Sequence, residues 1–123
     1  MAKVTLEVCC YNLESVLNAQ SAGADRIELC ANRHDGGTTP SYGTLEVVRK
    51  QLQIPLFAMI RPRGGDFLYS RSEVEAMLHD IQMCKELGID GVVFGALTNE
   101  GQVDVPMVKE LVDRSSPMEV TFH

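Results

Sequence analysis

The chain has 123 residues, of which 45% are hydrophobic and 23% are charged, and its formal net charge is −6. This composition is typical of a globular domain, and the acidic balance argues against a nucleic-acid partner. No apolar run approaches the roughly 20 residues that cross a bilayer, and the first residues lack the pattern of a secretory signal peptide. We therefore expect a cytoplasmic protein with no nucleic-acid and no membrane partner, whose four cysteines are thiols or metal ligands.

Predicted strands and helices alternate from the start of the chain. The first strand is predicted over Val4–Cys9, and the helix after it begins at an Asn12 N-cap and ends at a C′ glycine, Gly23. The second strand covers Arg26–Cys30. A long loop follows over residues 31–43, and the next helix has one apolar face, formed by Leu45, Val48 and Leu52.

The same alternation continues in the middle of the chain. A third strand is predicted over Pro55–Ile60, and a glycine-rich loop over Arg61–Phe67. The third helix opens with a capping box from Ser72 to Glu75. Its apolar face comprises Val74, Met77, Leu78, Ile81 and Cys84.

Two strands and one helix complete the predicted elements. The fourth strand is predicted over Gly91–Gly95, and the fourth helix begins near Asp104 with Pro106 in its first turn. A fifth strand covers Glu119–His123. We expect four apolar residues of the fourth helix to be buried, namely Val105, Val108, Leu111 and Val112.

A Gly-x-Asp sequence precedes two of the strands, at Gly23–Asp25 and Gly88–Asp90. The two glycines lie 65 residues apart, which is two βα units of about 30 residues each. This spacing predicts an α/β fold with a parallel sheet, and a TIM (β/α)8 barrel is the closed form that fits it.

A complete barrel needs about 250 residues. We therefore interpret residues 1–123 as the N-terminal half of a single TIM-barrel domain, covering the first four βα units and strand five. Half a barrel leaves two open strand edges, so we expect these residues to fold poorly on their own.

Polar residues share one parity along several predicted strands. Because side chains alternate along a strand, we expect this polar face to point into the barrel. It carries Glu7, Glu28, Arg61 and His123 in its middle or upper layers. Buried carboxylates need partners, and Arg61 and Arg63 are the cations expected for them. The set forms either a pocket at the functional face or a structural Glu–Arg network that fills the barrel.

Cys9 and Cys30 fall at the ends of neighbouring predicted strands with the same inward parity. Adjacent strands lie about 4.8 Å apart, so the two sulfurs can approach closely. Two close thiolates suit a soft ion such as Cu(I). The alternative is a pair of small, partly buried free thiols. Cys10 has the opposite parity, and Cys84 lies on an apolar helix stripe, so both are expected to pack in the core.

The glycine-rich loop has two interpretations. Arg61, Arg63 and Asp66 either form part of a site for an anionic ligand, with two guanidinium groups and free backbone N–H groups, or belong to a tight turn with Arg63 in solvent. His123 follows the fifth strand with inward parity, and it is the histidine expected to act as an acid, a base or a ligand.

Together these segments resemble the CutC copper-homeostasis family over the whole chain. The resemblance implies a TIM barrel of about twice this length, intracellular copper handling, and Cu(I) binding through Cys9 and Cys30. It also implies that Thr121-Phe122-His123 begins a longer motif of that family. The matching segments are Leu6–Cys9, Gly23–Cys30, Gly36–Ser41, Met59–Phe67 and Asp90–Gly95.

Three functional hypotheses follow. The first is a cytoplasmic copper-homeostasis protein that binds Cu(I) through Cys9 and Cys30. The second is an enzyme acting on a small anionic substrate, in which Arg61, Arg63 and Asp66 bind the anion and Glu7, Glu28 or His123 moves protons. The third is a barrel kept for a protein–protein role, which an apolar outer surface on the second or fourth helix would favour. We also expect a homodimer or a higher homo-oligomer.

Overall fold

Five parallel strands lie side by side in the order in which they occur along the chain. The computed structural model describes residues 2–123. Each strand has four residues, and the five are β1 (Glu7–Cys10), β2 (Arg26–Leu29), β3 (Leu56–Met59), β4 (Gly91–Phe94) and β5 (Glu119–Phe122). Sequential parallel strands joined by helices are the βα units that the Gly-x-Asp spacing predicted.

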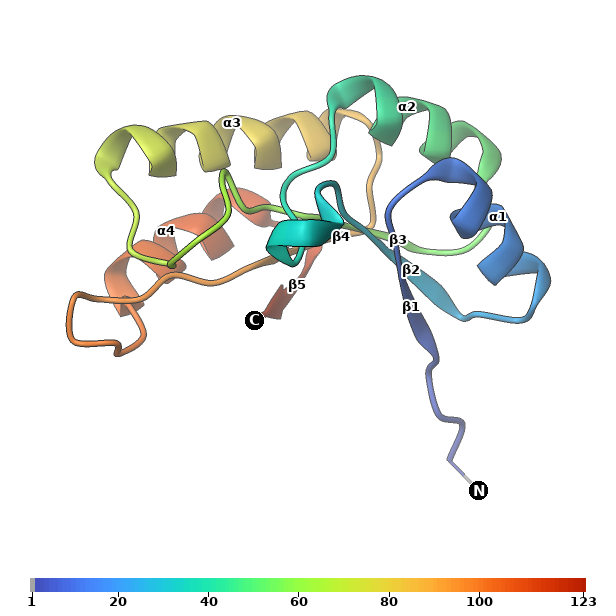
Figure 1. Cartoon of the computed structure of the whole chain (residues 1–123), viewed down its shortest axis with the longest axis horizontal. Coiled ribbons are helices and arrows are strands. Elements are labelled where there is room, and N and C mark those ends of the chain that lie inside the picture. The colour runs from blue at the N-terminus through green and yellow to red at the C-terminus, as the bar shows by residue number, and fades with distance from the viewer. Residues whose placement is uncertain (1) are drawn as a thin grey trace.

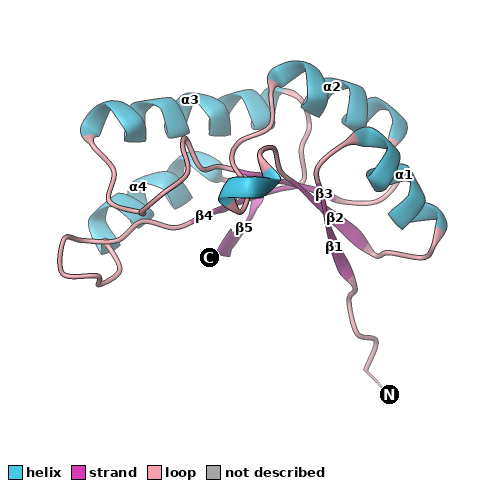
Figure 2. Ribbon diagram, viewed as in Figure 1, coloured by secondary structure: helices cyan, strands magenta, loops and turns pink. Residues whose placement is uncertain are grey.

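The helices cover one face of this row of strands and leave the other face open (Figures 1 and 2). They are α1 (Leu13–Ser21), α2 (Tyr42–Gln51), α3 (Arg71–Glu86) and α4 (Val105–Ser115), with a short 3-10 helix, η1 (Arg33–Asp35), after β2. Helices on the outer face and an open inner face are the arrangement of part of a TIM barrel. In residues 2–123, no helix combines the length and the apolar character that a membrane span requires.

Polar caps begin the helices, as the sequence predicted for two of them. The Asn12 side chain accepts a hydrogen bond from the Ser15 N–H, and Asp104 accepts one from Met107. The predicted capping box was placed two residues too late. It joins Ser70 to Glu73, because Ser-x-x-Glu occurs twice in overlap and the helix begins at Arg71.

The predicted first strand also begins too early, since Val4 is 84% exposed and pairing starts at Glu7. Glu7 pairs with Arg26, the first residue of β2, so residues before Glu7 have no neighbouring strand on that side. The Leu6 N–H instead donates to the Asp25 carboxylate at 2.8 Å. Asp90 does the same for the Leu56 N–H, also at 2.8 Å. Each Gly-x-Asp sequence thus ties the amino end of one strand to the one before it.

The strand parity read from the sequence is confirmed in β1, β2 and β3. Their helix-facing residues belong to one large apolar cluster, which includes Cys10, Ile27, Leu29, Leu56 and Ala58. A smaller cluster on the opposite face contains Cys30, Phe57, Met59 and Val93, with Tyr11 packed against it. Gly91 also faces inward, since a Cβ there would lie within 2.5 Å of the Phe57 ring. The inner face of the sheet therefore carries Cys9, Glu28 and Cys30, while Cys10 packs under the helices.

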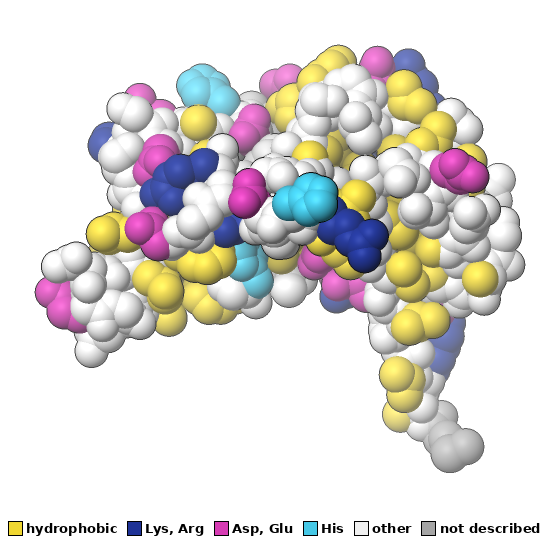
Figure 3. Space-filling view, viewed as in Figure 1, with side chains coloured by type: hydrophobic (Ala, Val, Ile, Leu, Met, Phe, Trp, Pro, Cys, Tyr) yellow, Lys and Arg dark blue, Asp and Glu magenta, His cyan; other side chains and the backbone are white. Residues whose placement is uncertain are grey.

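Helix α4 differs from the prediction on one side. Leu111 is fully buried as expected, but Val105 is 66% exposed and Val112 is 41% exposed. Each helix packs on the sheet through a narrow stripe, and these two valines lie outside it. The space-filling view shows hydrophobic side chains at the surface beside α4 and along the N-terminal segment (Figure 3).

Candidate functional site

The two inward-facing cysteines meet at the carboxyl ends of β1 and β2. The Cys9 and Cys30 Sγ atoms lie 3.7 Å apart, as the shared strand parity predicted. Cys9 keeps an exposed side, whereas Cys30 is only 2% exposed. The backbone positions the pair, because Cys9 is the register partner of Glu28 and Cys30 lies two residues beyond Glu28.

Glu28 brings a carboxylate to the same place. Its Oε1 lies 3.7 Å from the Cys30 Sγ, close enough to accept a hydrogen bond from that thiol. In residues 2–123, the side chains of Cys9, Glu28 and Cys30 form the one group whose ligand atoms all lie within 4.8 Å of one another and could hold a metal ion. The donor set is two soft sulfurs and one hard oxygen.

Burial keeps the thiols protonated at neutral pH. Desolvation, and then the neighbouring Cys9 and Glu28, raises the pKa of Cys30 strongly. Desolvation also raises the pKa of Cys9, and hydrogen bonding to Tyr11 partly offsets that rise. A thiol must lose its proton to bind a metal, so metal binding here releases protons.

Tyr11 and Gly37 complete the surroundings of the thiol pair. Tyr11 was not identified from the sequence, and Gly37 was placed in the loop after the second strand without being related to the cysteines. A Cβ at Gly37 would lie 3.2 Å from the Cys30 Sγ, which is a tight contact, so this loop closes over the sulfur most easily with glycine. Gly37 has a φ of +106°, a conformation that other residues rarely adopt. Tyr11 has the parity of Cys9, and extending the strand reading by two residues would have found it.

Arg61 is the buried cation at this end of the sheet, and it binds loop backbone instead of a carboxylate. It is 7% exposed. Its Nη1 donates to the carbonyls of Asp35 and Gly37, and its Nη2 donates to the carbonyl of Gly65. Its Nε is buried without a hydrogen-bond partner in the part of the chain that the structure describes. The guanidinium thus joins the loops after β2 and β3 while its charge has no ion-pair partner among residues 2–123.

His123 lies next to this cation at the end of β5. Its ring meets the Phe67 ring edge-on, with centroids 5.2 Å apart, and the Arg61 guanidinium lies over the same Phe67 ring at 5.1 Å. Partial desolvation, and then the charge of Arg61, lowers the pKa of His123 below its ordinary value. The imidazole is therefore neutral at pH 7 and is able to accept a proton.

Glu7 does not meet Arg61 or Arg63, which corrects the pairing expected from the sequence. It forms an ion pair with Arg26 Nε at 2.5 Å. The Arg26 guanidinium in turn lies 4.3 Å above the Phe57 ring. Arg26 is the first residue of β2 and lies directly opposite Glu7, so it is much closer to this carboxylate than the cations at the other end of the sheet are. Glu7 therefore lies in a satisfied pair at the amino ends of the strands.

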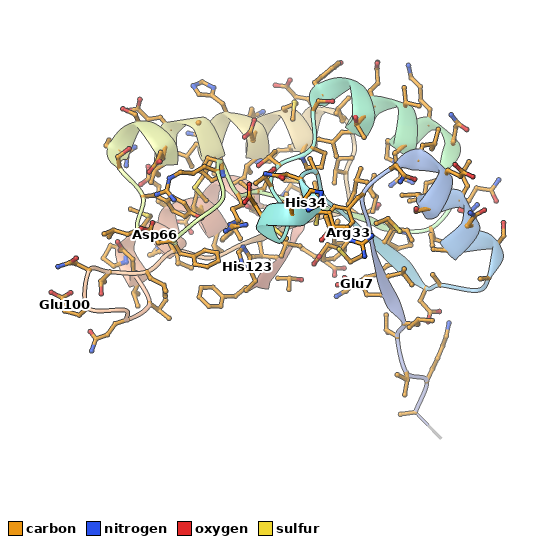
Figure 4. The ribbon with its side chains drawn as sticks, in the orientation of Figure 1. Glu7, Arg33, His34, Asp66, Glu100 and His123 are labelled. Carbon is orange, nitrogen blue, oxygen red and sulfur yellow. The ribbon has the colours of Figure 1, made fainter. Side chains whose placement is uncertain are left out.

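Arg63 and Asp66 lie in the loop before α3. Arg63 pairs with Glu73 at 2.5 Å and with Asp66 at 3.1 Å. It also donates to the Leu68 carbonyl. In Figure 4, Asp66 and Glu7 lie on opposite sides of His123. These contacts anchor the loop to α3, and a role of Arg63 and Asp66 in anion binding stays a prediction.

Comparison with known proteins identifies the family of this chain. The CutC family profile matches residues 4–123. A CutC family protein from Chromobacterium violaceum is 55% identical over 118 residues, covering 96% of this chain and 48% of that protein. The human "copper homeostasis protein cutC homolog" is 54% identical over 118 residues, covering 96% of this chain and 43% of that protein.

A solved structure agrees with these matches. The crystal structure of CutC from Streptococcus agalactiae superposes with a TM-score of 0.91 at 35% sequence identity, covering 98% of this chain and 59% of that one. The likeness confirms the α/β fold as part of a TIM barrel. The chain spans about half the length of the curated relatives that it matches. Since the family match extends over nearly every residue, this chain belongs to the CutC family.

Proposed function

We propose that this chain is part of a cytoplasmic copper-homeostasis protein that binds Cu(I) through Cys9 and Cys30. The observation that carries the proposal is the 3.7 Å distance between the two sulfurs on the inner face of the sheet. A metal ion bound to thiolate lies about 2.3 Å from sulfur, so one ion can reach both. Two cysteine sulfurs favour a soft ion over the harder divalent metals.

The neighbouring groups support a site for a metal ion. Glu28 lies close enough to Cys30 to receive its proton as the metal enters. Gly37 and the inner-face cluster shield Cys30, while Cys9 remains open to solvent. One exposed and one buried sulfur suit an ion that arrives from outside and is then partly enclosed.

The test is a competition titration of Cu(I) against a coloured chelator, using the full-length protein that contains this chain. The Cys9→Ser/Cys30→Ser variant is expected to lose more than about 100-fold in affinity, since removing even an outer-shell partner costs 10–100-fold. Cys84→Ser is the matched control, because Cys84 is fully buried on the helix side of the sheet. Equal affinities of wild type and the double variant would refute the proposal.

A second candidate function is an enzyme that acts on a small anion at the same end of the barrel. It is favoured by one observation, the buried guanidinium of Arg61 with a free Nε and no ion pair among residues 2–123. A buried charge without a counter-ion is costly, and a bound oxyanion would offset that cost. In this reading His123 and Glu28 are the groups that move protons.

Titration with inorganic phosphate and with acetate tests this second candidate. An anion near Arg61 would offset the positive charge that lowers the pKa of His123. The pKa of His123, followed by NMR, is therefore expected to rise when the anion binds. A pKa that stays constant at saturating phosphate and acetate would contradict an anion site beside Arg61.

A further inference from the structure

The two thiols differ in exposure, and this difference also suits a reaction other than metal binding. Cys9 is exposed and Cys30 is buried, while their sulfurs lie 3.7 Å apart. We propose that Cys9 and Cys30 form a reversible disulfide by exchange with a small disulfide, and that oxidation closes the copper site. The disulfide itself does not depend on copper binding, and only its effect on copper rests on the proposed function.

Little movement is needed to form this bond. A disulfide has an S–S length of about 2.05 Å, so the sulfurs, now 3.7 Å apart, must approach by about 1.7 Å. Cys9 lies in β1 and Cys30 directly follows β2, and the Cys30 N–H donates to the Cys10 carbonyl at 2.9 Å, which holds the backbone in place. Rotation of the exposed Cys9 side chain can supply the movement.

The other two cysteines of the chain are separated from this pair. Cys10 follows Cys9 directly, yet its side chain points to the helix-facing side and lies against the Val8 carbonyl. Cys84 lies in α3 and is fully buried. The sheet therefore favours one pairing among the four cysteines of the chain.

Access to the pair is one-sided. A hollow of about 350 Å³ opens beside Cys9, lined by Cys9, Cys10, Tyr11, Asn12, Ser15 and Arg33. Cys30 is covered by Gly37, where an added Cβ would lie only 3.2 Å from the Cys30 sulfur. An incoming disulfide therefore meets the Cys9 sulfur first.

The exchange proceeds in two steps that balance. Cys9 first loses its proton, and its thiolate attacks one sulfur of the small disulfide RSSR; the S–S bond of RSSR breaks, a mixed disulfide forms, and the departing RS⁻ takes up a proton and leaves as RSH. The Cys30 thiolate then attacks the Cys9 sulfur, the bond between Cys9 and SR breaks, and the second RS⁻ is protonated and leaves as RSH. Glu28, 3.7 Å from Cys30, can take up the Cys30 proton and return it to the departing thiolate. In sum, two electrons and two protons pass from the cysteine pair to RSSR.

The test uses the full-length protein, freed of copper with a chelator and equilibrated with oxidised and reduced glutathione. Mass spectrometry of its peptides is expected to show a Cys9–Cys30 link and a loss of two hydrogen atoms, both reversed by dithiothreitol. Cys30→Ser should instead accumulate glutathione on Cys9, because no thiol then resolves the mixed disulfide. Cys84→Ser serves as the control and should behave like wild type.

Three outcomes would overturn the proposal. These are a stable glutathione adduct on Cys9 in the wild type, a Cys9–Cys10 link, or four unchanged thiols in oxidised glutathione. Repeating the reaction in denaturant should abolish the selectivity, since only the folded sheet brings Cys9 and Cys30 together. The copper titration is a separate measurement, so a failed copper site and a failed disulfide are distinguishable. Oxidised protein should also bind Cu(I) less tightly than reduced protein if both proposals hold.

Discussion

The charged side chains at the two ends of the sheet differ in whether they form ion pairs. At the amino ends of the strands, three pairs of charged side chains of opposite sign form. These pairs are Lys3–Asp25, Glu7–Arg26 and Arg49–Asp90. At the carboxyl ends, Glu28 and Arg61 form no ion pair within residues 2–123, and the thiols of Cys9 and Cys30 face each other.

This difference separates scaffold from site. Charged side chains that form ion pairs can be accommodated in a fold without a large loss of stability. A buried charge without a partner destabilises the fold, and such charges are found most often at functional sites. The Gly-x-Asp repeats belong to the first group, since Asp25 and Asp90 bind strand amides at the amino end. Variants at the amino end should therefore change stability alone, and variants at the carboxyl end should change ligand binding.

Arg61→Met is expected to have the largest effect on stability. Arg61 is an exception to the comparison above, because it lies at the carboxyl ends of the strands and yet also stabilises the fold. The substitution removes three hydrogen bonds from a charged donor to loop carbonyls, and the free energy of unfolding should fall by about 3 kcal/mol. The pKa of His123 should also rise, because the charge of Arg61 helps to lower it. Chemical denaturation and NMR titration of the full-length protein measure the two effects.

Arg33→Met is the matched control for Arg61, since Arg33 lies in the loop after β2 that Arg61 binds, but its own side chain is exposed. Its free energy of unfolding should stay within about 0.5 kcal/mol of wild type. A loss below 1 kcal/mol for Arg61→Met would mean that the loops do not depend on this guanidinium.

Asp90→Ala should have the second largest effect on the free energy of unfolding. The Asp90 carboxylate accepts hydrogen bonds from the Leu56 N–H and from Arg49. Losing both should lower the free energy of unfolding by about 1–2 kcal/mol, with no change in Cu(I) affinity. A Cu(I) affinity that falls with stability would show that the two ends of the sheet are coupled.

Glu28→Gln should have the opposite effect to Asp90→Ala, with little change in stability and a loss of Cu(I) affinity. Glu28 forms no ion pair in residues 2–123, so the free energy of unfolding should change by less than about 0.5 kcal/mol. The Cu(I) affinity should fall about 10-fold, as is usual when a neighbour of a metal ligand is removed. Glu7→Gln is the control at the amino end, and it should leave the affinity unchanged. The idea fails if Glu7→Gln weakens Cu(I) binding as much as Glu28→Gln does.

Lowering the pH should remove the contribution of exposed ion pairs to the free energy of unfolding, which is the smallest of the expected effects. Hydrogen bonding by the Leu6 N–H and by Lys3 lowers the pKa of Asp25, and Arg63 lowers the pKa of Glu73. A lowered folded-state pKa adds stability above the unfolded value of about 4, and this is lost as pH falls through the folded pKa. Stability measured from pH 6 to pH 3 should fall less steeply in Asp25→Asn/Glu73→Gln than in wild type. Identical slopes would contradict this assignment.

Much of the site could be predicted because strand parity is a local property. The alternation of side chains placed Cys9, Glu28 and Cys30 on the inner face, and the structure confirms this arrangement. Tyr11 was within reach of the same rule. Strand beginnings were less predictable, because the first paired residue, Glu7, depends on where β2 begins.

The pairing of charges could not be predicted in the same way. The sequence offered Arg61 and Arg63 as partners for the carboxylates, yet Glu7 pairs with Arg26, and Arg63 pairs with Glu73. Arg61 instead binds carbonyls of residues 24 and 26 positions away in the chain. Which ion pairs form depends on distances between remote segments, and composition carries no such information.

The sequence by itself determined the βα alternation, the inner and outer faces of the strands and the membership of the CutC family. Each rests on a local period or on a motif that survives in the order of residues. Only the tertiary structure decided the partners of Glu7, Arg61 and Arg63 and the exposure of Val105 and Val112. Those properties depend on how strands, loops and helices pack against one another, because packing brings side chains that are far apart in the chain within a few ångströms.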